Sequence, residues 1–268
     1  MNQQNIEHYS TKLIKAFVFP FRVIPPLLNL EPKIPNEGMS IPHSREPVSL
    51  ARCLAPRETI IGNNNGATSK RGKKYMGGHH PDFGKRAPRM VSAQGDTIDL
   101  AQMGQDKAEA KLAFVLKHDL KGPGIHAIPV MRDTENGVPC FEVVNSRFRD
   151  WQIKTQAPVA DSASYGVLAQ GTTQVDPRRL DITLAGTGME QSDEPLSAGV
   201  GATEQGKLAN AVACQANTLG ELGITFKAGE VILTGSQSEL EQVAEGEKLE
   251  KRVRKQRLGV KFYRRSAV

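Results

Sequence analysis

The sequence has no apolar run long enough to cross a membrane as a helix, and it contains only three cysteines. Cys53, Cys140 and Cys214 lie far apart, which excludes a disulfide framework and the paired spacing of a zinc site. The short apolar segment 16–21 is interrupted by Pro20, and no small-residue cleavage site follows it. We therefore expect a protein of the reducing cytoplasm rather than a secreted one.

Motifs of several functional classes are also missing. No Gly-x-Ser-x-Gly sequence accompanies the histidines, and the glycines of segment 62–66 are not followed by Gly-Lys-Ser or Gly-Lys-Thr, as a phosphate-binding loop requires. Nine basic residues lie in segment 248–265, but neither an aromatic stacking pattern nor a nucleic-acid motif accompanies them. We interpret this run as a solvated strand edge or frayed tail, and we expect neither a nucleic-acid nor a membrane partner.

The pattern of residue types along the sequence changes near residue 60. Prolines interrupt residues 1–59, so we expect an irregular N-terminal arm with at most a short helix over 7–18. From residue 60 to 268, short apolar runs alternate with glycine-rich turns, which predicts one sheet-rich domain ending in a basic tail. Strands are expected at 112–116, 139–144, 180–184 and 231–233. Apolar residues at helical spacing predict a helix over 208–222, which Gly223 ends.

Six segments resemble, in the right order, motifs of one enzyme family. They are His-His-Pro-Asp-Phe-Gly at 79–84, the strand and turn at 113–124, and segments 139–151, 159–164, 210–217 and 223–236. Together they resemble the 2-oxopent-4-enoate hydratases of the fumarylacetoacetase-like group. The resemblance implies an α+β fold with a curled, mostly β core and outer helices. It also implies a homo-oligomer.

The resemblance further implies a reaction. Such a hydratase adds water to 2-hydroxypenta-2,4-dienoate and yields 4-hydroxy-2-oxopentanoate in the breakdown of aromatic compounds. The small 2-hydroxy or 2-oxo acid is held by a divalent ion, magnesium or manganese, which acts as a Lewis acid. Three glutamates supply the hard oxygen ligands of this ion, while a lysine and an aspartate transfer protons.

This chain retains part of that set. Glu109 and Glu142 match two of the three metal-binding glutamates, and Asp82 matches the catalytic aspartate. Glu142 lies inside an apolar run, where an unpaired carboxylate would be costly, so its functional role is the best supported. The residues expected to contact the substrate are Asp161, Ser162, Ser164 and Ser236.

Two departures from the family pattern concern the site itself. Lys111 stands where the family has its remaining metal-binding glutamate, and Asn63 and Asn64 stand where the family has two consecutive lysines, so that the catalytic lysine is missing. We hypothesise that the Lys111 ammonium takes the place of the cation and pairs with Glu109 or Glu142. The alternative is that Lys111 points away and Asp106 or water completes a weaker metal site.

These departures leave two functional classes open. The retained carboxylates favour a metal-dependent hydratase whose activity is impaired, because an asparagine cannot exchange a proton near neutral pH. Lys111 and Asn63 favour a catalytically inert member that acts as a structural or binding partner. A related decarboxylase of oxalocrotonate-type substrates is a third reading.

Overall fold

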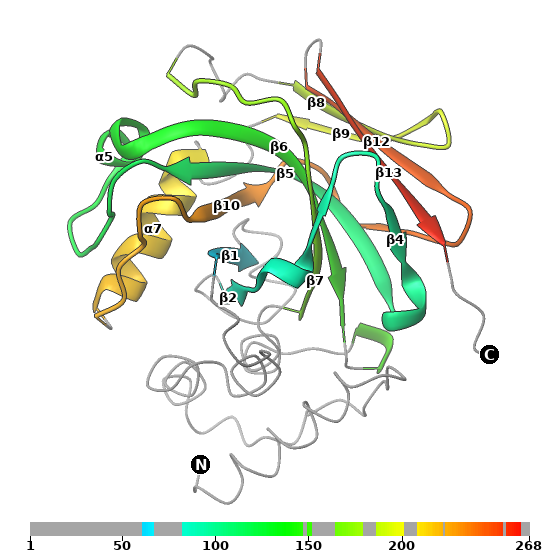
Figure 1. Ribbon diagram of the computed structural model, residues 1–268, viewed down its shortest axis with the longest axis horizontal. Helices are drawn as coiled ribbons and strands as arrows, with labels where there is room; N and C mark the ends of the chain where they lie inside the picture. Colours follow the sequence, from blue (N-terminus) through cyan, green and yellow to red (C-terminus); the bar gives the residue numbers. More distant parts are fainter. Residues whose placement is uncertain are drawn as a thin grey trace, which may run out of the picture.

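Two β-sheets dominate the computed structural model, which describes residues 61–66, 82–146, 149–151, 164–178, 186–200, 208–221, 223–253 and 256–263 (Figure 1). The larger, eight-stranded sheet follows the order β2-β1-β10-β5-β6-β7-β3, with β11 paired to β5. Its strands are β1 (Gly62–Gly66), β2 (Asp82–Arg86), β3 (Val91–Ala93), β5 (Asp106–Leu116), β6 (Thr134–Asn145), β7 (Tyr165–Gln170), β10 (Val231–Ser236) and β11 (Glu241–Gln242).

The smaller sheet has five strands in the order β4-β13-β12-β8-β9. They are β4 (Thr97–Asp99), β8 (Gly186–Gln191), β9 (Glu194–Val200), β12 (Lys248–Val253) and β13 (Gln256–Tyr263). Two α-helices are described, α5 (Ala127–Asp133) and α7 (Leu208–Glu221), with 3-10 turns at Pro88–Met90, Leu100–Gln102 and Arg149–Trp151. The expected α+β fold with a curled, mostly β core is confirmed.

The long strands β5 and β6 form the centre of the larger sheet and arch across the molecule (Figure 1). They pair antiparallel from Asp106 opposite Asn145 to Leu116 opposite Thr134. Because side chains alternate between the two faces of a strand, Ala108, Ala110, Leu112 and Phe114 share one face, and Glu109 and Lys111 share the other. The sheet therefore separates an apolar face from a face that carries charge.

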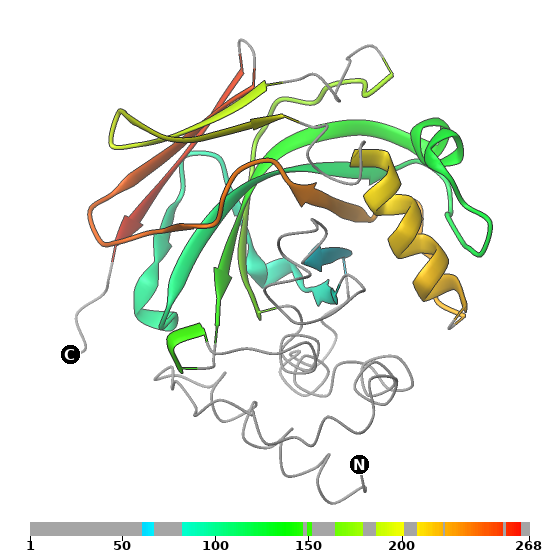
Figure 2. The same cartoon turned by 180° about the vertical axis from the view of Figure 1, so that it is seen from behind.

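The apolar face of β5 is covered by different elements at its two ends. Leu112 and Phe114 pack with α7 and the turn before α5. Ala108 and Ala110 pack instead against the five-stranded sheet, whose inward-facing residues include Leu249 and Val260. Figures 1 and 2 show α7 at one end of the arch and strands β8, β9, β12 and β13 at the other. The opposite face of β5 is thereby left to the site.

The turn of residues 121–124 packs directly on α7. Two of the family-like segments, 113–124 and 210–217, therefore meet in space. Asn217 on α7 accepts a hydrogen bond from the backbone N–H of Ile125 and donates one to its carbonyl, both at 2.8 Å. A Cβ on Gly122 would lie 2.4 Å from the Cα of Asn217. Only glycine fits so close a contact between a turn and a helix backbone.

Most of the expected elements that fall within the described residues are confirmed. Strands 112–116, 139–144 and 231–233 lie inside β5, β6 and β10, and the helix expected at 208–222 is α7. Gly223 follows α7 with a φ of 80°, as a helix-ending glycine does. The strand expected at 180–184 and the N-terminal arm 1–59 lie outside the described residues. None of the described helices combines the length and apolar character needed to cross a bilayer.

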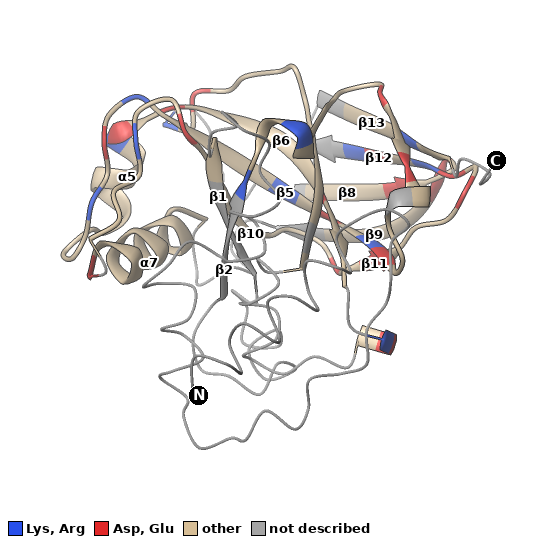
Figure 3. Ribbon diagram, turned by 60° about the horizontal axis from the view of Figure 1, so that its bottom comes forward, with Lys and Arg blue, Asp and Glu red and all other residues tan. Residues whose placement is uncertain are grey.

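The interpretation of segment 248–265 as a solvated edge or frayed tail is wrong for the strands it contains. β12 lies between β13 and β8 within the sheet, and its basic residues appear there in Figure 3. Leu258, Val260 and Phe262 of β13 are buried, and so is Lys251 of β12. The frequent lysines and arginines hid the alternating apolar residues that place this hairpin in the core.

Candidate functional site

Strands β5 and β6 bring two glutamates together on the charged face. Glu109 is the register partner of Glu142, and Lys111 is the partner of Cys140 on the same pair of strands. The two-residue step from Glu109 to Lys111 places both side chains on one face. The site is thus assembled by strand register rather than by sequence proximity, since Glu142 lies far along the chain from Glu109.

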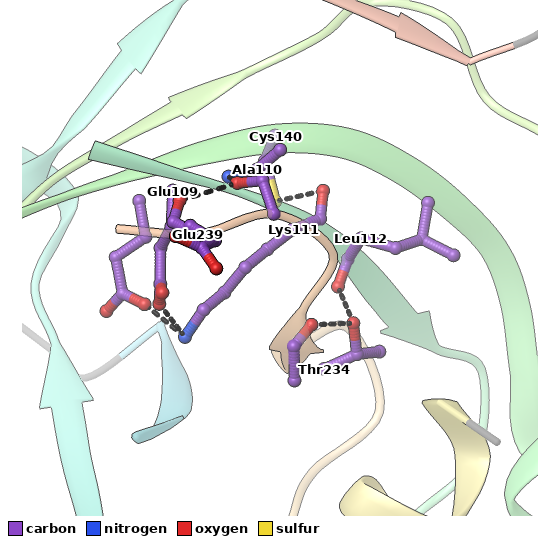
Figure 4. A network of polar contacts seen from close by, with 10 residues as sticks. Glu109, Ala110, Lys111, Leu112, Cys140, Thr234 and Glu239 are labelled. Atoms are coloured by element: carbon purple, nitrogen blue, oxygen red, sulfur yellow. Dashed lines mark hydrogen bonds and ion pairs between the residues drawn. The ribbon is translucent and has the colours of Figure 1, made fainter. Parts of the chain in front are cut away.

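The Lys111 ammonium connects both carboxylates, and Figure 4 shows its contact with Glu109. Its Nζ lies 2.9 Å from Oε1 of Glu109 and also forms an ion pair with Oε2 of Glu142. The side chains of Lys111 and Glu142 are only 1% and 2% exposed, and that of Glu109 is 14% exposed. The hypothesis that Lys111 pairs with these carboxylates is confirmed. The alternative, in which Lys111 points away, is wrong.

Electrostatics keep this lysine charged. Burial by itself would lower the pKa of the Lys111 ammonium, but the charges of Glu109 and Glu142 outweigh burial and raise the pKa above its ordinary value. Burial raises the pKa of the Glu142 carboxyl, while the positive charges of Lys111 and Arg86 act against that rise. An ammonium between two carboxylates is therefore a stable arrangement of the buried charges.

The backbone of Lys111 is held from the other side of the sheet. Lys251 of β12 donates through Nζ to the carbonyl oxygen of Lys111 and, at 2.9 Å, to Oε1 of Gln237. The Cys140 thiol donates to the same carbonyl at 3.3 Å. Sequence reasoning missed Lys251, because nothing in a run of basic residues distinguishes the one that is fully buried.

The remaining catalytic candidates lie on β1 and β2, which end the larger sheet beyond β10. Asn63 is the partner of Ile232 on β10, and β10 is the neighbour of β5. Asp82 opens β2, opposite Gly66 at the end of β1, and Asn64 is two positions away along β1. Adjacent residues of a strand face opposite sides of the sheet, so these backbone positions alone do not bring Asn63 and Asn64 to one face, and the catalytic roles of Asn63, Asn64 and Asp82 stay predictions.

Of the four residues expected to contact the substrate, Ser236 and Ser164 lie within the described residues. Ser236 on β10 is the register partner of Lys111, so it lies beside the ion pair. Ser164 is buried, with a φ of 53°, immediately before β7. Asp161 and Ser162 lie outside the described residues. The structure therefore places Ser236 next to Lys111 and leaves the contribution of the 161–164 loop as a prediction.

A cavity of about 590 Å³ lies on the same side of the larger sheet. Its lining includes Leu168, which is the register partner of Glu142, together with Val231 and the buried Arg86. This volume is within the range of small-molecule sites, and its mostly apolar wall carries the Arg86 guanidinium and the Asp96 carboxylate. The cavity has the size of a site for a small organic molecule.

The described residues do not fit a divalent metal ion. Magnesium and manganese prefer several carboxylate or carbonyl oxygens, but among the described residues no three His, Cys, Asp or Glu side chains are grouped to hold an ion. Asp106, the residue suggested to complete a weaker site, lies three positions before Glu109 on β5. Both retained glutamates bind the Lys111 ammonium instead.

Comparison with curated proteins finds enzymes that act on 2-hydroxydienoates. The chain is 44% identical over 198 residues to a 2-hydroxyhexa-2,4-dienoate hydratase of Comamonas testosteroni, covering 73% of this chain and 75% of that protein. It is 44% identical over 176 residues to a 2-hydroxypent-2,4-dienoate hydratase of Pseudomonas putida, covering 65% and 79%. A 2-keto-4-pentenoate hydratase of Paraburkholderia xenovorans is 33% identical over 84% of each chain.

Solved structures give the same fold. A 4-oxalocrotonate decarboxylase from Pseudomonas putida G7, complexed with magnesium and adipate, superposes with a TM-score of 0.86 at 25% identity over 98% of both chains. A 2-hydroxyhepta-2,4-diene-1,7-dioate isomerase from Mycobacterium marinum superposes less closely, with a TM-score of 0.59 at 15% identity over 78% of each chain. No protein-family profile matches the chain.

Proposed function

We propose, since the chain belongs to the 2-keto-4-pentenoate hydratase family, that its reaction is the hydration of 2-hydroxypenta-2,4-dienoate during the breakdown of aromatic compounds. The product is 4-hydroxy-2-oxopentanoate. The observation that carries the proposal is the charged face of β5 and β6, where Glu109 and Glu142 meet, with a cavity of small-molecule size on the same face of the sheet. The names of the related hydratases supply the substrate class.

The reaction defines what the site must do. Relative to the substrate, the product carries one added hydrogen on C3, one on C5 and a hydroxyl on C4, while the enol at C2 becomes a ketone. Negative charge builds up on the C2 oxygen as the double bonds shift, so a fixed positive charge near that oxygen lowers the barrier. Proton donors and acceptors must also lie near C3 and C5.

Among the described residues, Lys111 and Arg86 are buried positive charges on that side of the sheet. Arg86 lines the cavity and suits the substrate carboxylate. Lys111 suits the C2 oxygen, but its single charge is already shared by two carboxylates. We therefore propose a hydratase with weak turnover, in which Asp82 remains the group able to exchange protons and Asn63 and Asn64 orient water by hydrogen bonding.

A second candidate function follows from the same ion pair. If the ammonium that neutralises Glu109 and Glu142 leaves too little positive charge for the enolate, the chain is an inert member of the family that binds the acid or a partner without turnover. The likeness to the decarboxylase keeps the removal of CO₂ from an oxalocrotonate-type acid as a third reaction to assay.

The family resemblance also leads us to propose a homo-oligomer in the cytoplasm. Magnesium or manganese is the ion that the resemblance implies, and the decarboxylase from Pseudomonas putida G7 was solved with magnesium in one complex and calcium in another. Light scattering on the purified protein gives the number of subunits. A mass equal to one chain at micromolar concentration would contradict the oligomer.

The decisive experiment follows the ultraviolet absorbance of 2-hydroxypenta-2,4-dienoate with magnesium, with manganese and with a chelator. The unaltered chain is compared with the variant Lys111→Glu, Asn63→Lys, Asn64→Lys. We expect slow consumption by the unaltered chain and faster, metal-dependent consumption by the variant. Losing one positioned acid or base slows a reaction by about 10²–10⁴-fold, which sets the scale of the difference. No consumption by the unaltered chain, with activity in the variant, would instead establish the inert member.

A further inference from the structure

We infer that the Lys111 ammonium is a built-in cation that occupies the site between Glu109 and Glu142, so that this chain binds no divalent ion there. The same geometry implies the converse. A single substitution, Lys111→Glu, turns the cluster into a three-carboxylate site that takes up Mn²⁺ or Mg²⁺. The inference concerns the same site as the proposed hydratase reaction but does not rest on turnover.

The first support is the position of the ammonium. Nζ of Lys111 contacts one oxygen of each glutamate, at 2.9 Å for Glu109 and in a closer ion pair for Glu142. A cation that bridges two carboxylates from neighbouring strands has the place that a bound metal ion would take. The side chain extends from β5 toward this point, as Figure 4 shows for Lys111 and Glu109.

The second support is burial. Lys111 and Glu142 are almost completely enclosed, and a buried charge is tolerated only when it is paired. A divalent ion entering between the carboxylates would displace the ammonium into surroundings where it has lost both partners. It would also meet the repulsion of a neighbouring positive charge at short range. The ion pair and the metal therefore exclude each other.

The third support is the balance of charge. One ammonium and two carboxylates give the cluster a net charge of −1. In Lys111→Glu the three carboxylates carry −3, and one divalent ion restores −1. The substitution changes the residue's charge by two units, which equals the charge of the ion, and it adds a hard oxygen ligand of the kind these ions prefer. Lysine at this position is thus the electrostatic equivalent of glutamate plus a divalent ion.

The strand that carries Lys111 is held in place by hydrogen bonds that do not involve a metal ion. The carbonyl of Lys111 is already bonded by Lys251 and by the Cys140 thiol, and β5 pairs with β6 throughout the cluster. Position 111 therefore lies on a strand that is fixed by backbone hydrogen bonds and by hydrogen bonds from buried side chains. This makes Lys111→Glu a change of charge on an otherwise fixed frame.

The test is Mn²⁺ binding, measured by electron paramagnetic resonance and calorimetry on the full chain. The proteins are the unaltered chain, Glu142→Gln, Lys111→Glu, and the double variant Lys111→Glu with Glu142→Gln. We expect Lys111→Glu to bind one Mn²⁺ at least about 100-fold more tightly than the unaltered chain, since affinity follows the charge count of the ligands. The double variant should lose this gain, because it removes one of the three carboxylates.

Each outcome bears on the inference. Mn²⁺ bound by the unaltered chain and lost in Glu142→Gln would overturn it, and so would a folded Lys111→Glu variant that gains no binding. Mn²⁺ retained in Glu142→Gln comes from elsewhere on the chain and agrees with it. If Lys111→Glu unfolds in buffer, its thermal unfolding is followed with added Mn²⁺. Stabilisation by the ion supports the inference, and the absence of any stabilisation counts against it. None of these readouts requires turnover. Failure of the hydratase assay can therefore be distinguished from failure of the inference about the Lys111 ammonium.

Discussion

Lys251 reaches from the five-stranded sheet to the carbonyl oxygen of Lys111 in the larger sheet, so that two buried lysines, 140 positions apart, meet at one backbone group. One lysine is neutralised by carboxylates, while the other is bonded to the neutral acceptors of Lys111 and Gln237. The surroundings of the two lysines therefore shift their pKa values in opposite directions. The pKa of Lys111 is raised by its carboxylates, whereas burial lowers the pKa of Lys251 to about 8.

The lowered pKa of Lys251 predicts a stability that rises with pH. Between about pH 8 and its ordinary value of 10.5, the unfolded chain binds more protons at this residue than the folded chain, so deprotonation favours folding. We expect the free energy of unfolding of the unaltered chain to gain about 2 kcal/mol over Lys251→Met between pH 7.5 and pH 10. Urea unfolding at both pH values measures the difference.

The exposed lysine of the neighbouring strand, Lys261, supplies the control for this pH comparison. Lys261→Met removes the same charge from the same sheet without touching Lys111 or Gln237. If the difference in free energy of unfolding between the unaltered chain and Lys251→Met is the same at pH 7.5 and pH 10, the buried ammonium titrates like an ordinary lysine and the prediction is wrong.

Buried and exposed ion pairs should differ in their contribution to stability. Glu142→Gln leaves the enclosed Lys111 ammonium with one carboxylate, and we expect a loss of about 3–5 kcal/mol in the free energy of unfolding. Asp119→Asn weakens the exposed pair with Lys227, which solvent screens, and should lose far less stability than Glu142→Gln. Equal losses in the two variants would contradict the role assigned to Lys111.

The contact between the 121–124 turn and α7 predicts a strict requirement for glycine. In Gly122→Ala the new methyl group would lie 2.4 Å from the Cα of Asn217, so the turn or the helix must move. Overpacking of this kind destabilises a protein by about 1–3 kcal/mol. Gly188→Ala on β8 is the matched control, because its Cβ meets no heavy atom within 4 Å and the change should stay within about 0.5 kcal/mol. Thermal unfolding of both variants separates the two cases.

Cys140 should resist thiol reagents in the folded protein. Its side chain is fully buried, and burial raises the pKa of the thiol to about 11, so little of the reactive thiolate forms at pH 8. We expect less than about 5% alkylation of Cys140 by iodoacetamide in an hour under native conditions, with complete reaction in urea. Peptide mass spectrometry reads the modification at this residue. Rapid native alkylation would mean that β5 and β6 separate frequently.

The sequence by itself determined the parts of this protein that depend on local pattern. Alternating and helical apolar spacing predicted β5, β6, β10 and α7, and the order of the family motifs predicted the fold and the hydratase relationship. The pairing of Lys111 with Glu109 or Glu142 was also predictable, because lysine replaces a glutamate of the family there and an unpaired buried carboxylate is costly. That the ammonium contacts both carboxylates came from the structure.

Only the tertiary structure decided which distant side chains share a buried environment. Lys251 belongs to a run of basic residues whose composition indicates solvent, but its register on β12 turns it inward to the carbonyl of Lys111. Likewise, Gly122 and Asn217 each belong to a recognisable motif, but only the docking of the turn on α7 makes the missing side chain necessary. Local pattern is set by neighbours along the chain. Burial and charge pairing are set by strand register and by the packing of one layer on another.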